Sequence, residues 1–412
     1  MSASSLGRLL ARLGPEVEDP DEETFILFAY ERPTAQNLGF IDSHASVLDL
    51  TVAGRDLTIH QSPAILTSNR SGGTTGAVVA EWLARPSNLL FSHAGPDTEA
   101  PPLLGPDSAI LELGCGIAGM IGLALTGKGT RSSAAKGGHQ PAIANRKKRS
   151  SRSITRRADV STPASHSPSP SPAPSLPITA SFANANTVGR YVLTDQPYVA
   201  KYLLKNLEEN GAGEDGVQAD VHHHGHGHKD AHSHGHAQAQ AHGKKKPTST
   251  DDNALYFRPL DWETDEVTSS LLRTEVERGA SPGAGTASSS TKTRSIHDSF
   301  DAVLACDCIY NEALVTPLVQ TFADACRLRE KEREGERERG SSREPLGKLP
   351  PTVCVVAQQL RDPDVLAAWL AAFHAEFRVW RVPDELLDPA LCPGAGFAVH
   401  IGILRAADER SS

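Results

Sequence analysis

The chain has 412 residues, of which 22% are charged and 5% aromatic, and it carries a formal net charge of −9. This length allows one large domain or two ordinary ones, and the mildly acidic balance argues against a protein that coats nucleic acid. The six cysteines are spread mostly inside apolar runs, with no C-x-x-C pair and no short disulfide-type framework, and no apolar run reaches the roughly 18 to 20 residues that a membrane span requires.

These features predict a soluble protein of a reducing compartment, the cytoplasm alone or the cytoplasm and nucleus. The apolar run at the N-terminus is too short for a signal peptide. We expect a monomer that contacts neither membranes nor nucleic acid directly. A basic stretch at residues 145–157 leaves nuclear import or contact with ribosomal RNA open as the less favoured alternatives.

The first pattern in chain order is rich in β-branched and aromatic residues. It covers residues 24–30 and 46–62, and the second of these segments contains a glycine at its centre. Such segments predict an N-terminal antiparallel β addition. We therefore expect a β extension and lid in residues 1–100, ahead of a main domain in residues 101–412.

Alternating strand and helix patterns follow, in five pairs. They cover residues 109–127, 190–210, 253–278, 299–329 and 351–377, and two last strands at 378–383 and 396–406 have no helix between them. This order predicts an α/β, Rossmann-like fold with a mainly parallel seven-stranded sheet. The final two strands predict a C-terminal antiparallel hairpin that contributes one reversed edge strand.

Low-complexity segments interrupt these pairs, and we expect them to be disordered inserts because they cannot bury enough apolar surface to offset their ordering entropy. They cover residues 127–186, 211–253, 279–297 and 329–350. The last one alternates charge signs, so a solvated extension of the preceding helix is the alternative. Nine histidines lie between residues 222 and 242. They would bind zinc or nickel weakly but lack fixed geometry, so no working metal site is predicted.

Three glycines, Gly114, Gly116 and Gly119, have the spacing G-x-G-x-x-G between an apolar strand and a helix-compatible run. Such a turn brings backbone close to a ligand at a helix N-terminus, but the spacing alone does not identify the ligand. Glu112 ends the strand. A carboxylate there suits a ligand with a free ammonium group better than a pyrophosphate, because like charges repel. S-adenosylmethionine carries such an ammonium group.

Acidic residues also end the next two predicted strands. Asp195 is placed to hydrogen-bond ribose hydroxyls, although an Asp there is also a good helix N-cap. Asp261 could reach the amino edge of an adenine, and Trp262 could lie against its face. The alternative for Trp262 is a plain core residue.

Four segments, "LELGCGIAG", "LTDQPYVAKYLLKNLEEN", "LDW" and "DAVLACDCIYNEALVTPLVQTF", resemble the class I, seven-β-strand lysine methyltransferases that carry a D-x-x-Y motif. Within that family, the chain is most similar to the fungal ribosomal lysine N-methyltransferases. The likeness covers nearly all of the chain outside the low-complexity inserts. It implies S-adenosylmethionine as the cofactor and a lysine of a ribosomal protein, of the large subunit, as the acceptor.

The resemblance also implies roles for individual positions. Those on the cofactor side are Gly114, Cys115 and Gly116 at the methionine part, Asp195 at the ribose, Trp262 at the adenine, and Cys306. Asp307 and Tyr310 would lie at the methyl-acceptor side as catalytic residues that orient the amine. A helix cap at Asp307 and simple packing at Tyr310 are the alternatives. Cys306 and Cys308 alternate on the predicted strand, so at most one should face the ligand.

One departure from the family pattern concerns the segment after "TGAVV". The family has a tryptophan there, whereas this chain has Ala80, with Trp82 two positions later in a stretch that looks shortened. This difference favours one alternative, a non-catalytic module that binds a cofactor or a partner. A separate alternative is an enzyme of the same fold with a different protein acceptor.

Overall fold

The computed structural model describes residues 4–30, 45–61, 72–92, 101–131, 186–212, 254–273, 297–338, 349–406 and 409. Most of the predicted inserts 127–186, 211–253 and 279–297 lies outside these residues, as do the histidine-rich and basic stretches. Their expected disorder stays a prediction.

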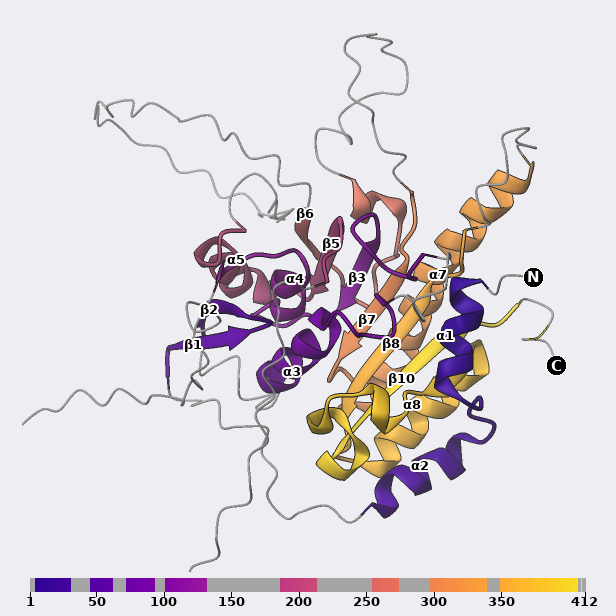
Figure 1. Ribbon diagram of the computed structural model, residues 1–412. Coiled ribbons are helices and arrows are strands. Elements are labelled where there is room, and N and C mark those ends of the chain that lie inside the picture. The colour runs from indigo at the N-terminus through magenta and orange to yellow at the C-terminus, as the bar shows by residue number, and fades with distance from the viewer. Residues whose placement is uncertain are drawn as a thin grey trace, which may run out of the picture.

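A seven-stranded mixed sheet forms the centre of the molecule (Figure 1). In spatial order its strands are β6 (Ala254–Pro259), β5 (Arg190–Asp195), β3 (Ala109–Leu113), β7 (Ala302–Cys306), β8 (Val353–Gln359), β10 (Phe397–Leu404) and β9 (Phe377–Arg381). The pairs from β6 through β8 are parallel, and β10 is antiparallel to both of its neighbours. The prediction of an α/β protein with a mainly parallel sheet is confirmed.

The reversed strand does not lie at the sheet edge, contrary to the prediction. β10 inserts between β8 and β9, so the edge strand is β9, which precedes it in the chain. The burial patterns agree with this order: all eight residues of β10 are buried, whereas β9 exposes Arg378. A strand whose residues are all buried is more stable with a neighbour on each side than at an edge.

Helices cover both faces of the sheet, and alternation along each strand supplies a core to each face. Ile110 belongs to a core cluster that includes residues of α1 (Ser5–Leu13), α3 (Gly72–Ala84), α4 (Met120–Leu125) and α5 (Ala200–Glu209). Its neighbour Leu111 belongs to a second cluster, with residues of α2 (Pro20–Ala29), α7 (Val315–Glu338) and α8 (Pro363–Glu376). Successive side chains of a strand point to opposite faces, so one buried strand serves both cores.

Residues 24–29 belong to helix α2, which ends before Tyr30, so the prediction of a strand at residues 24–30 is wrong. Asp19 caps the helix by accepting from the backbone N–H groups of Asp21 and Glu22, and Pro20 is the first helical residue. These start signals, together with packing of the buried Leu27 against the α8 side of the sheet, outweigh the β propensity of the segment.

The predicted antiparallel addition at residues 46–62 is confirmed as a hairpin of β1 (Val47–Val52) and β2 (Arg55–His60). Its two-residue turn has positive φ at Ala53 and Gly54, which matches the right-handed twist of the strands. A short third strand, β4 (Thr130–Arg131), pairs with the start of β2. The result is a small antiparallel sheet beside α5, at the end of the main sheet where β3 and β5 stop (Figure 1).

Several shorter elements also differ from the predictions. The helix expected at residues 265–278 is only the 3-10 turn η3 (Ser269–Leu272) within the described part of that range. Helix α7 continues to Glu338, so the first ten residues of the predicted insert 329–350 are helical. The remaining 3-10 turns are η2 (Pro197–Val199), η4 (Glu312–Leu314), η5 (Asp384–Leu386), η6 (Pro389–Leu391) and η7 (Pro393–Ala395). None of the helices in the described ranges has the length and apolar character to cross a membrane.

Candidate functional site

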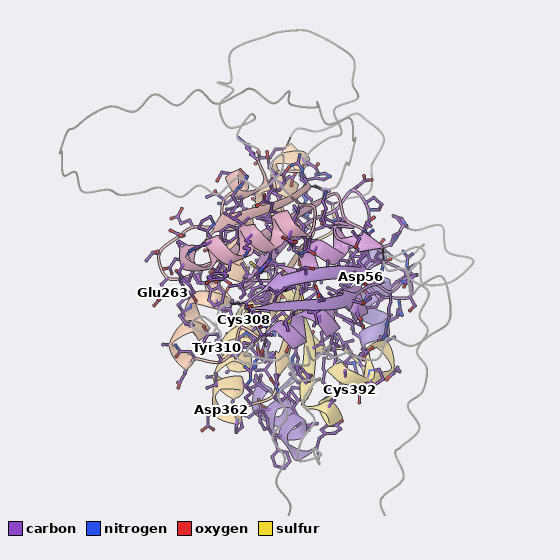
Figure 2. The ribbon with its side chains drawn as sticks, turned by 90° about the vertical axis from the view of Figure 1, so that its left-hand side faces the viewer. Asp56, Glu263, Cys308, Tyr310, Asp362 and Cys392 are labelled. Carbon is purple, nitrogen blue, oxygen red and sulfur yellow. The ribbon has the colours of Figure 1, made fainter. Side chains whose placement is uncertain are left out.

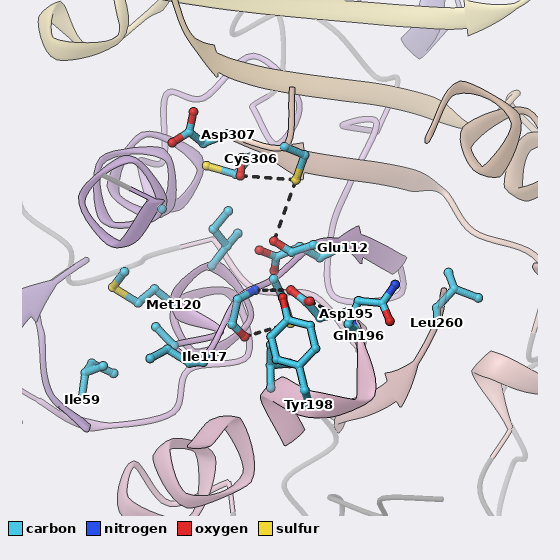
Figure 3. Close-up of a pocket in the computed structure, with 18 of the residues that line it drawn as sticks. Ile59, Glu112, Ile117, Met120, Asp195, Gln196, Tyr198, Leu260, Cys306 and Asp307 are labelled. Atoms are coloured by element: carbon cyan, nitrogen blue, oxygen red, sulfur yellow. Dashed lines mark hydrogen bonds between the residues drawn. The ribbon is translucent and has the colours of Figure 1, made fainter. Parts of the chain in front are cut away.

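A pocket opens at the carboxyl ends of β3, β5, β6 and β7 (Figure 3). Strands that follow β3 in the chain, β5 and β6, lie on one side of it, and the next strands, β7 and β8, lie on its other side. The pocket therefore lies where the strand order reverses. Open α/β sheets bind ligands at such a point. The lining includes all of the residues assigned from the sequence: Glu112, Gly114, Cys115, Gly116, Asp195, Asp261, Trp262, Cys306, Asp307 and Tyr310.

The glycine turn needs glycine at Gly114 for two reasons. Its φ is +67°, and an added Cβ would lie 2.7 Å from Cys308 Sγ and 3.3 Å from the ring of Trp262. Gly116 also has a positive φ, of +65°, but an added Cβ there would meet nothing within 4 Å. Gly114 therefore allows close packing beneath the turn, whereas Gly116 presents bare backbone to the open pocket.

Asp195, at the end of β5, is tied to this turn. Its Oδ2 accepts from the backbone N–H of Gly116 at 2.8 Å, and its Oδ1 accepts from the N–H of Gln196 at 2.7 Å. Burial raises its pKa, against these two hydrogen bonds. Each carboxylate oxygen has a second acceptor site, so Asp195 can still accept from two hydroxyl groups of a ligand.

Glu112 is a buried acid of the pocket, with 3% of its surface exposed. Tyr191 of β5 donates its hydroxyl proton to Glu112 Oε2 at 2.7 Å. Burial raises the pKa of Glu112 to about 7; the hydrogen bond from Tyr191 lowers it, and the nearby charge of Asp195 raises it. A cationic ligand would favour the ionised form of this carboxyl group.

Asp261 and Trp262 follow β6 and form another wall. Asp261 Oδ1 accepts a hydrogen bond from the N–H of Glu263 at 2.9 Å, so one oxygen of this carboxylate stabilises the turn that contains it. The Trp262 ring lies against Gly114, and its Nε1 is buried without a hydrogen-bond partner among the described residues. A buried indole N–H without an acceptor is uncommon, and a ligand acceptor would satisfy it.

Asp307 is in the left-handed region, with φ of +59°, and only 1% of its surface is exposed. Arg361 forms an ion pair with its Oδ2, and Gln358 Nε2 donates to its Oδ1 at 3.2 Å. Burial raises the pKa of Asp307, against the charge of Arg361, which lowers it. The carboxylate is therefore held by protein groups, and neither Arg361 nor Gln358 was assigned a role from the sequence. Both follow the apolar core of β8, which is the signal that could have identified them.

The left-handed turn at Asp307 also corrects the prediction for the two cysteines. β7 ends at Cys306, and the chain then turns, so the strand alternation stops and both Cys306 and Cys308 line the pocket. Burial raises the pKa of both thiols well above the usual value, and that of Cys115 as well. Their thiols therefore stay protonated, which gives small and weakly polar walls rather than nucleophiles.

The rim of the pocket is aromatic. Tyr310 is 50% exposed and Tyr198, in the turn before α5, is 66% exposed, and both line the opening. Figure 2 shows Tyr310 beside Cys308 on the side of the molecule that carries the β1–β2 hairpin. The hairpin contributes Leu48, Leu50 and Ile59 to the lining, a wall that sequence reasoning missed. Its strand alternation could have identified these residues, because they all lie on one face.

Trp82 does not take part in the pocket. It is buried in α3 and donates from Nε1 to the backbone oxygen of Leu386 at 2.8 Å, while α3 contributes Gly76 to the lining. The tryptophan of the resembled family therefore has no counterpart in this pocket. Within the described ranges, no cluster of three or more His, Cys, Asp or Glu side chains could hold a metal ion.

No protein-family model matches the chain. It is similar to the diaminohydroxyphosphoribosylamino-pyrimidine deaminase of Schizosaccharomyces pombe, with 32% identity over 117 residues. This match covers 27% of the present chain and 26% of the deaminase, so the chain spans about a quarter of the curated protein that it matches.

This comparison overturns the identification of the chain as a class I lysine methyltransferase similar to the fungal ribosomal enzymes. The named relative is a deaminase, which belongs to a different class of enzyme. Methyl transfer to a lysine of a ribosomal protein is therefore not supported. The catalytic roles expected of Asp307 and Tyr310 depended on that reaction and are not carried further. The alternatives of another protein acceptor and of a non-catalytic module belonged to the same assignment and are set aside with it.

Proposed function

We propose that the pocket binds S-adenosylmethionine, within a Rossmann-like sheet. Numbered along the chain, the strands of the main sheet have the order 3-2-1-4-5-7-6, which shares its first five positions with dinucleotide-binding sheets. The hydrogen bond from Gly116 N–H to Asp195 Oδ2 carries the proposal, because it joins the glycine turn to an acid at the end of the neighbouring strand.

The pocket residues fit the parts of this ligand. The backbone at Gly114, Cys115 and Gly116 would receive the methionine part, with the carboxylate of Glu112 nearby for its ammonium group. Asp195 would accept from the ribose hydroxyls. When bound, the cofactor supplies a sulfonium centre, whose positive charge suits a pocket that already contains several acidic side chains.

The wall that follows β6 fits a purine base. Asp261 would accept from the adenine amino group, and Trp262 would lie along the ring, with its buried Nε1 available to an acceptor on the ligand. Cys306 would line the same cavity as a protonated thiol. NAD fits less well, because its pyrophosphate would lie near the carboxylates of Glu112 and Asp195.

Deamination is not proposed for this chain. Zinc-dependent base deaminases hold their metal with a P-C-x-x-C segment and a third ligand. The six cysteines of this sequence include no C-x-x-C pair, so the donor set for that zinc site is missing. The similarity to the deaminase also extends over only 26% of that protein.

Isothermal titration calorimetry at pH 8 with S-adenosylmethionine, S-adenosylhomocysteine, NAD and ATP tests the proposal. We expect the two sulfur nucleosides to bind and NAD to bind at least about tenfold more weakly. Asp195→Ala should weaken binding by about tenfold or more, because it removes the ribose acceptor and the anchor of the turn. Asp21→Ala, which changes an exposed acid of α2 outside the pocket, is the control. Tighter binding of NAD or ATP, or no binding of either sulfur nucleoside, would refute the assignment.

A further inference from the structure

Two asparagines on one face of α5 close the edge of the β1–β2 hairpin. Asn206 Oδ1 accepts from the N–H of His60 at 2.7 Å, and its Nδ2 donates to the oxygen of His60 at 3.1 Å. Asn210, at the C-terminal end of α5, makes the same pair of bonds with Thr58, each at 2.9 Å. Each side-chain amide therefore pairs with one residue of β2 as the backbone of a neighbouring strand would.

The spacing explains why a helix can take the place of a strand here. Four helical residues rise about 6 Å, and two strand residues rise about 6.8 Å, so asparagines at i and i+4 match alternate residues of β2. β4 pairs with β2 at Arg55 and Asp56, and the two asparagines continue along that same edge. The hairpin is thus attached to α5 through backbone groups that would otherwise lack partners.

Asn206 makes one more bond than its role at the hairpin requires. Its Nδ2 also donates to the backbone oxygen of Ile117 at 2.7 Å, in the segment directly after Gly116. The corresponding proton of Asn210 is used within α5, on the oxygen of Asn206. One fully buried amide group therefore contacts both the hairpin and the glycine turn.

These two structures form adjoining parts of the pocket lining. Ile59 and Leu48 come from the hairpin, and Ile117 follows the glycine turn, and all three line the cavity (Figure 3). Asn206 itself is not part of the lining. It contacts His60, the residue after Ile59, and also Ile117, so one side-chain amide joins these two parts of the lining.

We propose that Asn206 is a positioning residue that holds the hairpin wall at a defined distance from the glycine turn and thereby determines ligand affinity. This inference rests on the proposed S-adenosylmethionine site. Asn210 is the matched comparison, because it attaches the same hairpin by equivalent bonds and does not contact the turn. A purely structural role predicts equal effects for the two asparagines, whereas a positioning role predicts that only Asn206 affects the turn.

The first arm of the test uses hydrogen–deuterium exchange on the full chain without ligand. The amides of Cys115 and Gly116 are suitable reporters, because they are hydrogen-bonded to Thr194 and Asp195. Asn206→Ala should speed their exchange by roughly fivefold or more, together with exchange across β2. Asn210→Ala should speed exchange in β2 only. Equal effects of the two variants on the turn would overturn the proposal.

The second arm measures the affinity for S-adenosylmethionine by calorimetry, well below the melting temperature of each variant. Asn206→Ala should weaken binding roughly tenfold, and Asn210→Ala by less than about twofold. Equal weakening would contradict a positioning role. If the wild-type protein does not bind this ligand, the proposed function fails, while the exchange arm still decides whether Asn206 couples the two walls.

A third measurement keeps the test decisive if Asn206→Ala does not fold. Asn206→Ser keeps a polar side chain, but its hydroxyl is too close to the helix backbone to replace the amide nitrogen, so it should show the same pattern as Asn206→Ala. In the wild-type protein, ligand should slow exchange in the hairpin and in the turn together. Protection of the turn alone would overturn the coupling without the use of any variant.

Discussion

Tyr191 donates its hydroxyl proton to Glu112 Oε2 over 2.7 Å, where β5 and β3 run side by side beneath the glycine turn. Both side chains are buried, and the pKa of Glu112 is raised to about 7. The charge at the floor of the pocket therefore changes within the physiological pH range. Two of the predictions below depend on this titration.

The affinity for S-adenosylmethionine should rise with pH between 6 and 8. A ligand ammonium group is attracted by ionised Glu112, and the ionised fraction of a group with pKa near 7 increases about tenfold over that interval. The dissociation constant should fall by up to about tenfold when measured by calorimetry in buffers of matched ionic strength. Glu112→Gln should bind weakly and with little dependence on pH. A flat profile for the wild-type protein would show that Glu112 does not contact the cation.

The same residue should make the unliganded protein less stable at high pH. Its folded-state pKa lies above the unfolded value of 4.5, so the folded state binds more protons between pH 4.5 and 7, and stability falls as the pH rises through that range. Glu112→Gln removes this penalty. We expect the variant to gain up to about 3 kcal/mol in unfolding free energy at pH 8 and almost nothing at pH 4. Urea denaturation at both pH values measures the difference, and equal gains at both would contradict the assignment.

Gly114→Ala should destabilise the fold more than Gly116→Ala. Both positions have positive φ, which costs a non-glycine residue about 1 to 2 kcal/mol. Only Gly114 lacks room for a Cβ, because Cys308 Sγ would lie 2.7 Å away, and overpacking adds about 1 to 3 kcal/mol.

Chemical denaturation of the two single variants and of Gly114→Ala combined with Cys308→Ala separates these contributions. Gly114→Ala should cost less unfolding free energy in the Cys308→Ala background than in the wild-type protein, because the overpacking is relieved. The cost of the backbone strain should remain. If the double variant shows no recovery, the contact between Gly114 and Cys308 is not the cause.

Arg361→Ala should destabilise the protein by about 2 kcal/mol at pH 8. The side chain of Asp307 has no exposed surface, and loss of the guanidinium would leave its carboxylate buried without a cation. The expected loss of stability is smaller than for a fully buried ion pair because 32% of the Arg361 side chain is exposed to solvent. The cost should shrink at pH 4, because the raised pKa of Asp307 lets the carboxyl protonate there. Thermal melts at the two pH values test this, and Arg361→Ala combined with Asp307→Asn should be nearly independent of pH.

The sequence was sufficient for the strand–helix alternation and for the residues at the ends of the core strands. Glu112, Asp195, Asp261 and Cys306 could be assigned to one pocket because the carboxyl ends of parallel strands meet at one edge of a sheet. It was not sufficient for the class of enzyme. The glycine turn and the D-x-x-Y motif suggested lysine methylation, and the comparison with known proteins corrected this, because features shared by many nucleotide-binding sheets do not identify an acceptor.

Local sequence by itself thus determined the α/β class, the glycine turn and the hairpin at residues 46–62, since these depend on periodicity and on turn residues close together in the chain. Only the tertiary structure decided that β10 lies inside the sheet and that Asp307 is paired with Arg361. The attachment of the hairpin by Asn206 is of the same kind. Each of these features depends on contacts between segments far apart in the chain, whose free energy outweighs local propensity and leaves no periodic pattern in the sequence.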